Sequence, residues 1–97
     1  MARKPTASQG QMRVRLGGKH YRLRFAAIKD YGDIVDPGKA DGRVIRIATW
    51  QNERDLLDSV IHEALHGSLP LLDEAAIHAT ANDLSRLLWR LGYRRTP

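Results

Sequence analysis

The chain contains no cysteine, and this absence excludes several chemistries. Without thiols the protein cannot form a disulfide framework, a thiolate metal site or a cysteine nucleophile. Any metal ion that it binds must therefore be held by nitrogen and oxygen ligands. The absence of cysteine also fits a cytoplasmic protein, which is the location that we expect.

Long apolar runs are absent as well. No segment approaches the roughly 20 consecutive apolar residues that a membrane-spanning helix requires. The N-terminal sequence MARKPTASQGQ has two basic residues but no apolar stretch behind them, so it does not resemble a secretory signal. We therefore expect no membrane partner.

Aromatic residues are few, with three Tyr, two Trp and one Phe among 97 residues, but the chain is 42% hydrophobic and 28% charged. This balance is typical of one folded domain with a single core. Residues 1–10 mix Pro, Ser, Thr, Gly and Gln without periodicity, which predicts a flexible N-terminal tail before a single domain at residues 11–95. The net charge of +5 often accompanies an acidic partner such as nucleic acid.

Alternating apolar and basic residues open the predicted domain. The segment MRVRLGGKHYRLRF, which begins at Met12, is broken by two glycines and predicts a β-hairpin with one buried face. Residues 29–42 are rich in Asp and Gly and include a Pro, so they predict a long loop. The β-branched segment RVIRIAT then predicts a third strand, with Ile45 and Ile47 as its buried pair.

Two helices are predicted after the strands. Asn52 is typical of an N-cap, and apolar residues recur at helical spacing from about Glu53 to His66, where Gly67 is a natural stop. Asp73 can cap a second helix that ends at Gly92. The predicted apolar stripe of that helix consists of Ile77, Ala81, Leu84, Leu88 and Leu91.

The expected fold class is α+β. We expect a small three-stranded antiparallel sheet packed on two antiparallel helices. The short connection between the helices makes them antiparallel neighbours.

The first predicted helix carries the motif H-E-x-x-H. His62 and His66 are four residues apart, so their imidazoles project from one face and can take two adjacent corners of a tetrahedral metal site. Glu63 is too close along the helix to share the metal comfortably, but it can reach a metal-bound water as a general base. The pattern favours a metal site over two unrelated histidines.

A third ligand is needed, because catalytic zinc usually takes three protein ligands and leaves the fourth position to water. Glu74 is the best candidate, since alternating steps of three and four along the apolar stripe lead back to it and place it beside His66. The alternative is that Glu74 is an acidic residue in the first turn of the helix, where the helix dipole stabilises its charge and no metal is needed. Asp73 and His78 are reserve candidates, and Zn²⁺ is the ion that such nitrogen and oxygen donors suit best.

The segment LLDSVIHEALHGSLPLLDEAA, with LLWRLGY closing the second helix, resembles the small zinc metallopeptidase-like proteins of phages and prophages. These are similar to a minimal version of the gluzincin group, which includes thermolysin. The resemblance covers about residues 12–94 and implies a minimal zincin-like core of a zinc peptidase, with Glu63 as catalytic base and three ligands: His62, His66 and Glu74. Only seven residues separate His66 from Glu74, far fewer than in thermolysin-like enzymes, so the substrate cleft must be built differently.

The function that the sequence favours is zinc-dependent hydrolysis of peptide bonds in a peptide or protein substrate, through a metal-bound water activated by Glu63. Candidates for stabilising the oxyanion are Tyr31, Tyr93 and His78. One alternative is a catalytically inactive metal-binding interaction protein. The other is a basic nucleic-acid-binding module with a structural or absent metal, which is not favoured because no aromatic residues are interleaved for base stacking. Its arginines would be Arg13, Arg15, Arg22, Arg24, Arg86, Arg90, Arg94 and Arg95.

Overall fold

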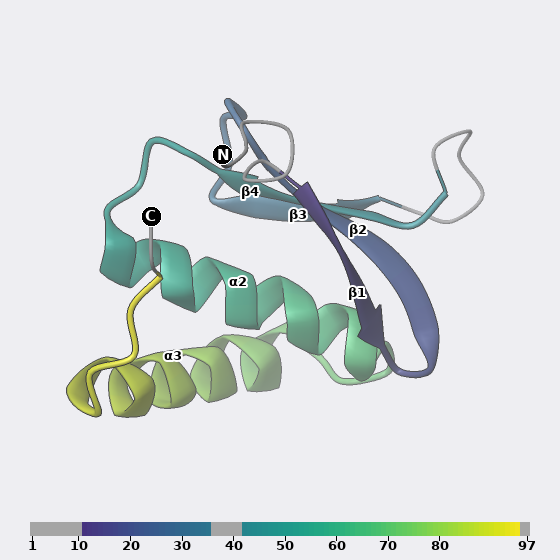
Figure 1. The fold of residues 1–97 in the computed structure, drawn as a ribbon. Coiled ribbons are helices and arrows are strands. Elements are labelled where there is room, and N and C mark those ends of the chain that lie inside the picture. Colours follow the sequence, from purple (N-terminus) through teal and green to yellow (C-terminus); the bar gives the residue numbers. More distant parts are fainter. Residues whose placement is uncertain (1–10, 36–41, 96–97) are drawn as a thin grey trace.

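The computed structural model describes residues 11–35 and 42–95, and the predicted N-terminal tail, residues 1–10, lies outside the described residues. The elements in chain order are β1 (Gln11–Leu16), β2 (Lys19–Ala26), β3 (Gly32–Val35), β4 (Val44–Ala48), α2 (Glu53–Ser68) and α3 (Glu74–Arg90). The sheet covers one side of α2, and α3 lies on the other side (Figure 1). The predicted α+β class is confirmed. Within these two ranges, no helix is long and apolar enough to cross a membrane.

The sheet differs from the predicted one in strand number and in direction. Its four strands are ordered β1-β2-β4-β3, and β2 and β4 run parallel, while the other two pairs are antiparallel. The prediction of a three-stranded antiparallel sheet was therefore wrong. The missed strand β3 has the sequence GDIV, which lies in the segment predicted as a loop. Residues 36–41 of that predicted loop lie outside the described residues.

An ion pair explains how β3 tolerates an aspartate. Asp33 lies directly opposite Arg46 of β4 in the antiparallel register. The guanidinium of Arg46 donates from Nε to Oδ1 of Asp33 at 2.9 Å and from Nη2 to the other carboxylate oxygen. Such a two-pronged contact fixes register as well as adding stability. Sequence alternation alone gives no sign of it.

The predicted hairpin is confirmed. Gly17 and Gly18 connect β1 to β2 with φ angles of 59° and 79°, as a two-residue type I′ turn requires. Gly17 also lies against the end of α2, where a Cβ at this position would be 3.1 Å from the backbone oxygen of Gly67. The turn therefore meets two demands that only glycine satisfies together.

The core lies between the sheet and α2. Leu56 and Val60 of α2 pack against a cluster of buried strand residues, which are Tyr21, Leu23, Ile45 and Ile47. Ile45 and Ile47 are fully buried, so the predicted pair is confirmed. These contacts use one face of the sheet and leave the alternate side chains on the other.

Helix α2 begins as predicted but ends later. The side chain of Asn52 accepts a hydrogen bond from the backbone N–H of Asp55 at 2.8 Å. At the other end the helix continues through Gly67, which is buried rather than terminal. A Cβ on Gly67 would lie 3.0 Å from Cδ1 of Leu16 and 3.4 Å from Cζ of Tyr21. Gly67 therefore allows close packing of the helix on the hairpin, and its prediction as a stop was wrong.

Helix α3 begins and ends at the predicted residues. Asp73 accepts a hydrogen bond from the backbone N–H of Ala76 at 2.8 Å, which confirms it as the N-cap. Gly92 follows the last turn with a φ of 91°, and its N–H donates to the carbonyl of Trp89 at 3.0 Å. The left-handed conformation explains why glycine stands there.

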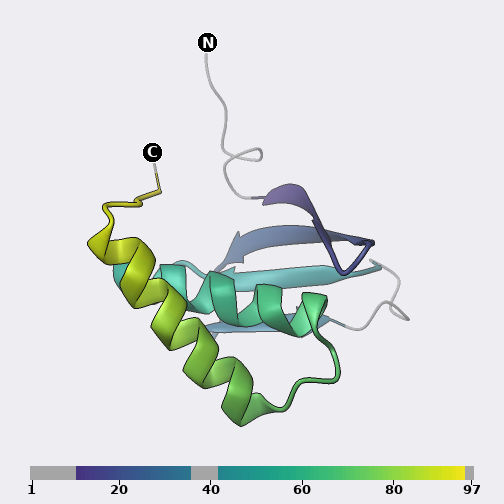
Figure 2. The same cartoon turned by 90° about the horizontal axis from the view of Figure 1, so that it is seen from below.

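The apolar stripe of α3 was predicted only in part. Ile77 and Ala81 are fully buried, whereas Leu84 and Leu91 are exposed and Ser85 is buried in their place. Figure 2 shows the reason, because α3 crosses α2 obliquely and does not run alongside it. A straight apolar stripe requires a nearly aligned partner.

A buried polar network joins the start of α2 to the sheet. The side-chain amide of Gln51 donates to the carbonyls of Tyr31 and Ala48, both at 3.0 Å. Its oxygen accepts a hydrogen bond from the Ser59 hydroxyl at 2.8 Å. Gln51 and Ser59 are buried, so a lost partner would leave an unsatisfied polar atom.

We expect Ser59→Ala to lower the free energy of unfolding by about 1–3 kcal/mol, because it leaves the oxygen of Gln51 buried without a donor. Ser85→Ala is the matched control. Ser85 is equally buried in a helix, but it donates only to the carbonyl of Asn82 within that helix, so we expect its loss to be nearly neutral. Urea unfolding followed by circular dichroism measures both. Equal losses in the two variants would contradict the role given to Gln51.

Candidate functional site

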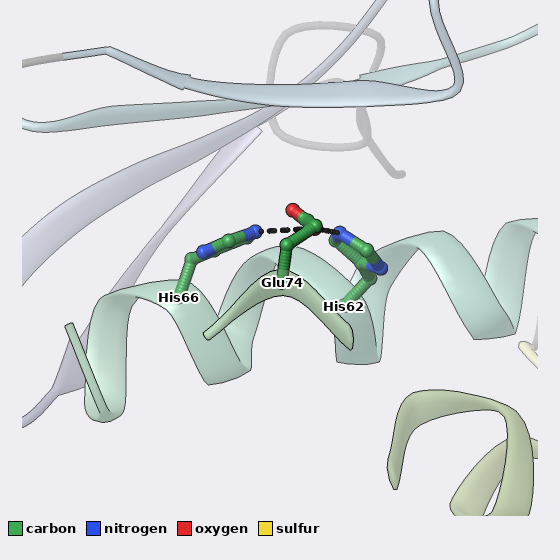
Figure 3. Close-up of side chains that lie close together, drawn as sticks. All are labelled: His62, His66 and Glu74. Atoms are coloured by element: carbon green, nitrogen blue, oxygen red, sulfur yellow. Dashed lines mark hydrogen bonds and ion pairs between the residues drawn. The ribbon is translucent and has the colours of Figure 1, made fainter. Parts of the chain in front are cut away.

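Three side chains from two helices converge at one point. His62 and His66 come from α2 and Glu74 is the first residue of α3 (Figure 3). Oε1 of Glu74 lies 2.8 Å from Nε2 of His62 and 3.2 Å from Nε2 of His66. One potential ligand atom from each residue lies within 4.8 Å of the others. These three residues, the metal-site trio, could hold a metal ion.

The helices position the trio by simple geometry. A separation of four residues is about one helical turn, and the ring centroids of His62 and His66 are 5.0 Å apart. The cap at Asp73 starts α3 so that Glu74 stands in its first turn. The side chain of Glu74 is 64% exposed, so its predicted place on the buried stripe was wrong. It reaches the histidines from the open end of α3 instead.

The surroundings of Glu74 favour its charged form. Loss of hydration alone would raise the pKa of this carboxyl group. The hydrogen bond with His66 and the charges that His62 and His66 can carry together outweigh that effect and lower the pKa. A metal-binding carboxylate must be deprotonated, so the lowered pKa suits this role.

The donor set fits a zinc-like ion. Two imidazole nitrogens and one carboxylate oxygen form the His₂Glu combination, which in catalytic zinc sites leaves one position open. Ligand atoms about 2.0–2.1 Å from a tetrahedral ion lie roughly 3.3 Å from one another. Glu74 lies 2.8 and 3.2 Å from the two histidine nitrogens, and all the ligand atoms lie within 4.8 Å of one another, so a tetrahedral ion would require small movements of the side chains.

Glu63 lies beside the trio but points toward the sheet. It is only 7% exposed and packs against Gly32 at the start of β3, where a Cβ would lie 3.1 Å from Cγ of Glu63 and 3.3 Å from Oε2. Burial raises the pKa of the Glu63 carboxyl, while the charges of His62 and His66 oppose this rise. Within the described ranges no hydrogen-bond donor reaches this carboxylate. Glu63 is thus a buried proton acceptor with a raised pKa.

Gly32 is a site residue that sequence reasoning missed. A glycine among aspartates is typical of a turn, so nothing in its neighbourhood indicates contact with a helix. Its lack of a side chain makes room for Glu63. Gly32 therefore positions Glu63 without being able to take part in chemistry itself.

A cavity of about 450 Å³ opens beside Glu63. Residues 30–32 form one wall, and α2 contributes Asp55, Asp58, Ser59, His62 and Glu63. His78 of α3 completes the lining. A ligand in this cavity could contact His62 and Glu63 together.

The three candidates for an oxyanion-stabilising residue do not lie together. Tyr31 and His78 line the cavity, and the His78 ring lies edge-on to His62 with centroids 6.3 Å apart. Tyr31 also packs against Trp50, with ring centroids 5.0 Å apart. Tyr93 follows α3 on an exposed segment and does not line the cavity. Only Tyr31 and His78 remain placed for this role.

The hairpin arginines lie on the sheet face opposite α2, since they alternate with the core residues. Arg13 is directly opposite Arg22 in the register of β1 and β2, and Arg24 lies beside Arg46 of β4. This outer face gathers positive charge away from the metal-site trio.

Two of the predicted arginines beyond α3 make contacts with aromatic rings. The guanidinium of Arg94 lies 3.4 Å from the ring centroid of Trp89 and donates to the carbonyl of that residue at 2.9 Å. The guanidinium of Arg95 lies 4.0 Å from the ring centroid of Phe25. Cation–π contacts therefore join the C-terminal segment to α3 and to the sheet.

Comparisons of this chain with family models, curated proteins and solved structures find no match. A fold by itself does not define a function. The function is therefore inferred from the chemistry of the site.

We expect the protein to bind about one zinc ion per chain through the metal-site trio. Glu74→Ala removes a direct ligand, so it should weaken zinc binding more than His78→Ala. His78 would at most support a ligand, and the loss of such a residue typically lowers the affinity about 10- to 100-fold. Elemental analysis gives the stoichiometry, and competition with a chelating dye gives the affinities. The reverse order of the two variants would mean that His78 is the third ligand.

Proposed function

We propose that this protein is a small zinc-dependent peptidase of the gluzincin type. The observation that carries the proposal is the buried carboxylate of Glu63, which has no donor partner in the described residues and lies directly beside His62, His66 and Glu74. Burying an unpaired acid costs stability. A site that uses the acid as a base accounts for this cost.

The roles of the residues follow from their positions. His62, His66 and Glu74 would hold the ion, and zinc in such a site supplies a Lewis acid that lowers the pKa of water toward about 7. Glu63 lies against Gly32 of β3 and within electrostatic reach of His62, His66 and Glu74 without being one of the ligands, so its carboxylate stays available as a base. It can accept a proton from the attacking water and pass it to the leaving amine.

The raised pKa of Glu63 supports this role. A general base is most effective when its pKa lies near the working pH, and burial moves this carboxyl in that direction. Gly32 holds the side chain against β3, which limits its conformations. Tyr31 and His78 are the residues of the cavity that can donate a hydrogen bond to a developing oxyanion.

Glu63→Gln is the sharpest test of this mechanism. Glutamine keeps the size and polarity of the side chain but cannot accept the proton, so turnover of a peptide substrate should fall by about 10²- to 10⁴-fold. Zinc binding and folding should be retained. The rate is measured by mass spectrometry on a peptide found by library digestion, with zinc occupancy determined in both proteins.

Glu53→Gln is the matched control, because Glu53 is an exposed residue in the first turn of the same helix. It should leave turnover unchanged. Undiminished cleavage by zinc-loaded Glu63→Gln protein would rule out Glu63 as the base. Zinc binding without cleavage of any peptide would instead favour an inactive metal-binding interaction protein.

The alternative function is nucleic-acid binding, and the arginines on the outer face of the sheet are the observation that favours it. Binding through phosphates weakens linearly with salt on a log-log plot. We expect no sub-micromolar, salt-sensitive complex with DNA or RNA at physiological salt. Fluorescence anisotropy with labelled oligonucleotides measures the affinity at several salt concentrations. If a complex forms and the slope of log affinity against log salt becomes smaller in a variant with Arg13→Ala and Arg15→Ala, nucleic-acid binding would be the better proposal.

A further inference from the structure

The cavity beside Glu63 is acidic although the whole chain is basic. Its lining includes Asp30, Asp55 and Asp58 as well as Glu63, and none of the lining residues that the structure describes is Lys or Arg. The chain as a whole carries a net charge of +5. The negative charge of this cavity is therefore a local property.

Helix α2 sets two of these carboxylates in line with the metal-site trio. Asp55, Asp58 and His62 follow one another at spacings of three and four residues, so they share one face of the helix. At about 1.5 Å of rise per residue, Asp58 lies about one turn and Asp55 about two turns before His62. Asp30 faces them from the segment before β3.

In the described part of the chain none of these aspartates forms an ion pair with a basic side chain. The ion pairs there join Arg46 to Asp33 and Glu74 to its two histidines, and none involves an aspartate of the cavity. A bound divalent ion would be offset by the charges of Glu74 and Glu63. The three aspartates of the cavity would still have no ion-pair partner among the residues that the structure describes.

Glu63 gives a second, independent indication of a ligand. More than nine-tenths of this residue is buried, it lines the same cavity, and it has no donor partner in the described ranges. Its carboxylate therefore borders the cavity without a protein partner in the described ranges. A buried carboxylate that borders a cavity favours a ligand with positive charge or hydrogen-bond donors.

We propose that this acidic cleft receives a cationic side chain, lysine or arginine, from the peptide substrate. This inference rests on the proposed function, since it assigns the substrate class of the same site. An extended peptide advances about 3.3–3.6 Å per residue. Asp58 and Asp55 lie one and two helical turns from His62, a distance that an extended peptide covers in about three residues. They could therefore contact a basic side chain within about three residues of the cleaved bond.

The test uses three short peptides with the same alanine-rich sequence. Two are acetylated and amidated and differ only by arginine or glutamine at one position, and the third is the glutamine peptide with a free amino terminus. We expect the blocked arginine peptide to bind the full-length, zinc-free protein about ten-fold more tightly than the blocked glutamine peptide. The preference should weaken as salt rises. Fluorescence anisotropy gives the affinities, and mass spectrometry gives cleavage by the zinc-loaded protein.

Two variants with the same change in charge identify the cleft. Asp55→Asn with Asp58→Asn should reduce the arginine preference to about two-fold or less, in binding and in cleavage. Glu53→Gln with Asp83→Asn also removes two negative charges, but from exposed positions outside the cavity, so it should keep the preference. A thermal melt of each variant checks folding.

The other outcomes separate the two proposals. Equal binding of the blocked arginine and glutamine peptides, or an equal loss of preference in both variants, would overturn the acidic cleft as the site. Tighter binding of the free-amine peptide than of the blocked arginine peptide would overturn the side-chain assignment. Arginine-selective binding that depends on Asp55 and Asp58, without cleavage of any peptide, would support the cleft and contradict the hydrolase.

Discussion

The close approach of α2 to the sheet is the constraint on which the site depends. Gly67 allows Leu16 and Tyr21 to touch the helix backbone, and Gly32 lets β3 approach Glu63. The buried hydrogen bonds of Gln51 hold the start of the same helix to the sheet. The two glycines and the hydrogen-bonded amide of Gln51 thus allow a short distance between α2 and the sheet, which larger side chains at the glycine positions would prevent. This short distance buries Glu63.

Burial distinguishes the two glutamates of the site. Glu63 points to the sheet and loses water, so its pKa rises, whereas Glu74 remains largely exposed and its pKa falls through its contacts with His66 and His62. Two carboxylates with pKa values pushed in opposite directions suit different tasks, one as a proton acceptor and one as a permanently charged ligand. The sheet would therefore contribute to the proposed chemistry although it supplies none of the trio.

Local rules of sequence predicted local structure well. The glycine turn of the hairpin, the caps at Asn52 and Asp73 and the buried Ile45 and Ile47 each depend on neighbours within a few residues. The meeting of His62, His66 and Glu74 was also predictable, because helical spacing and a short connection suffice. Strand β3 was not, since four residues with a glycine and an aspartate show no alternation, and their stability comes from pairing with distant β4. The position of Gly67 within α2 likewise depends on packing against the hairpin, which its own neighbours do not encode.

Net charge is misleading for this protein because the fold separates charges of opposite sign. Alternation along β1 and β2 directs arginines to the outer face of the sheet, while helical spacing in α2 directs Asp55 and Asp58 to the cavity. The arginines of the hairpin therefore add positive charge to the outer face and not to the site. A ligand in the cavity responds mainly to the nearest charges, because distant exposed charges are screened within about 8–10 Å at ordinary salt. For this reason a basic chain can present an acidic cleft, and the sign of the ligand follows from local geometry.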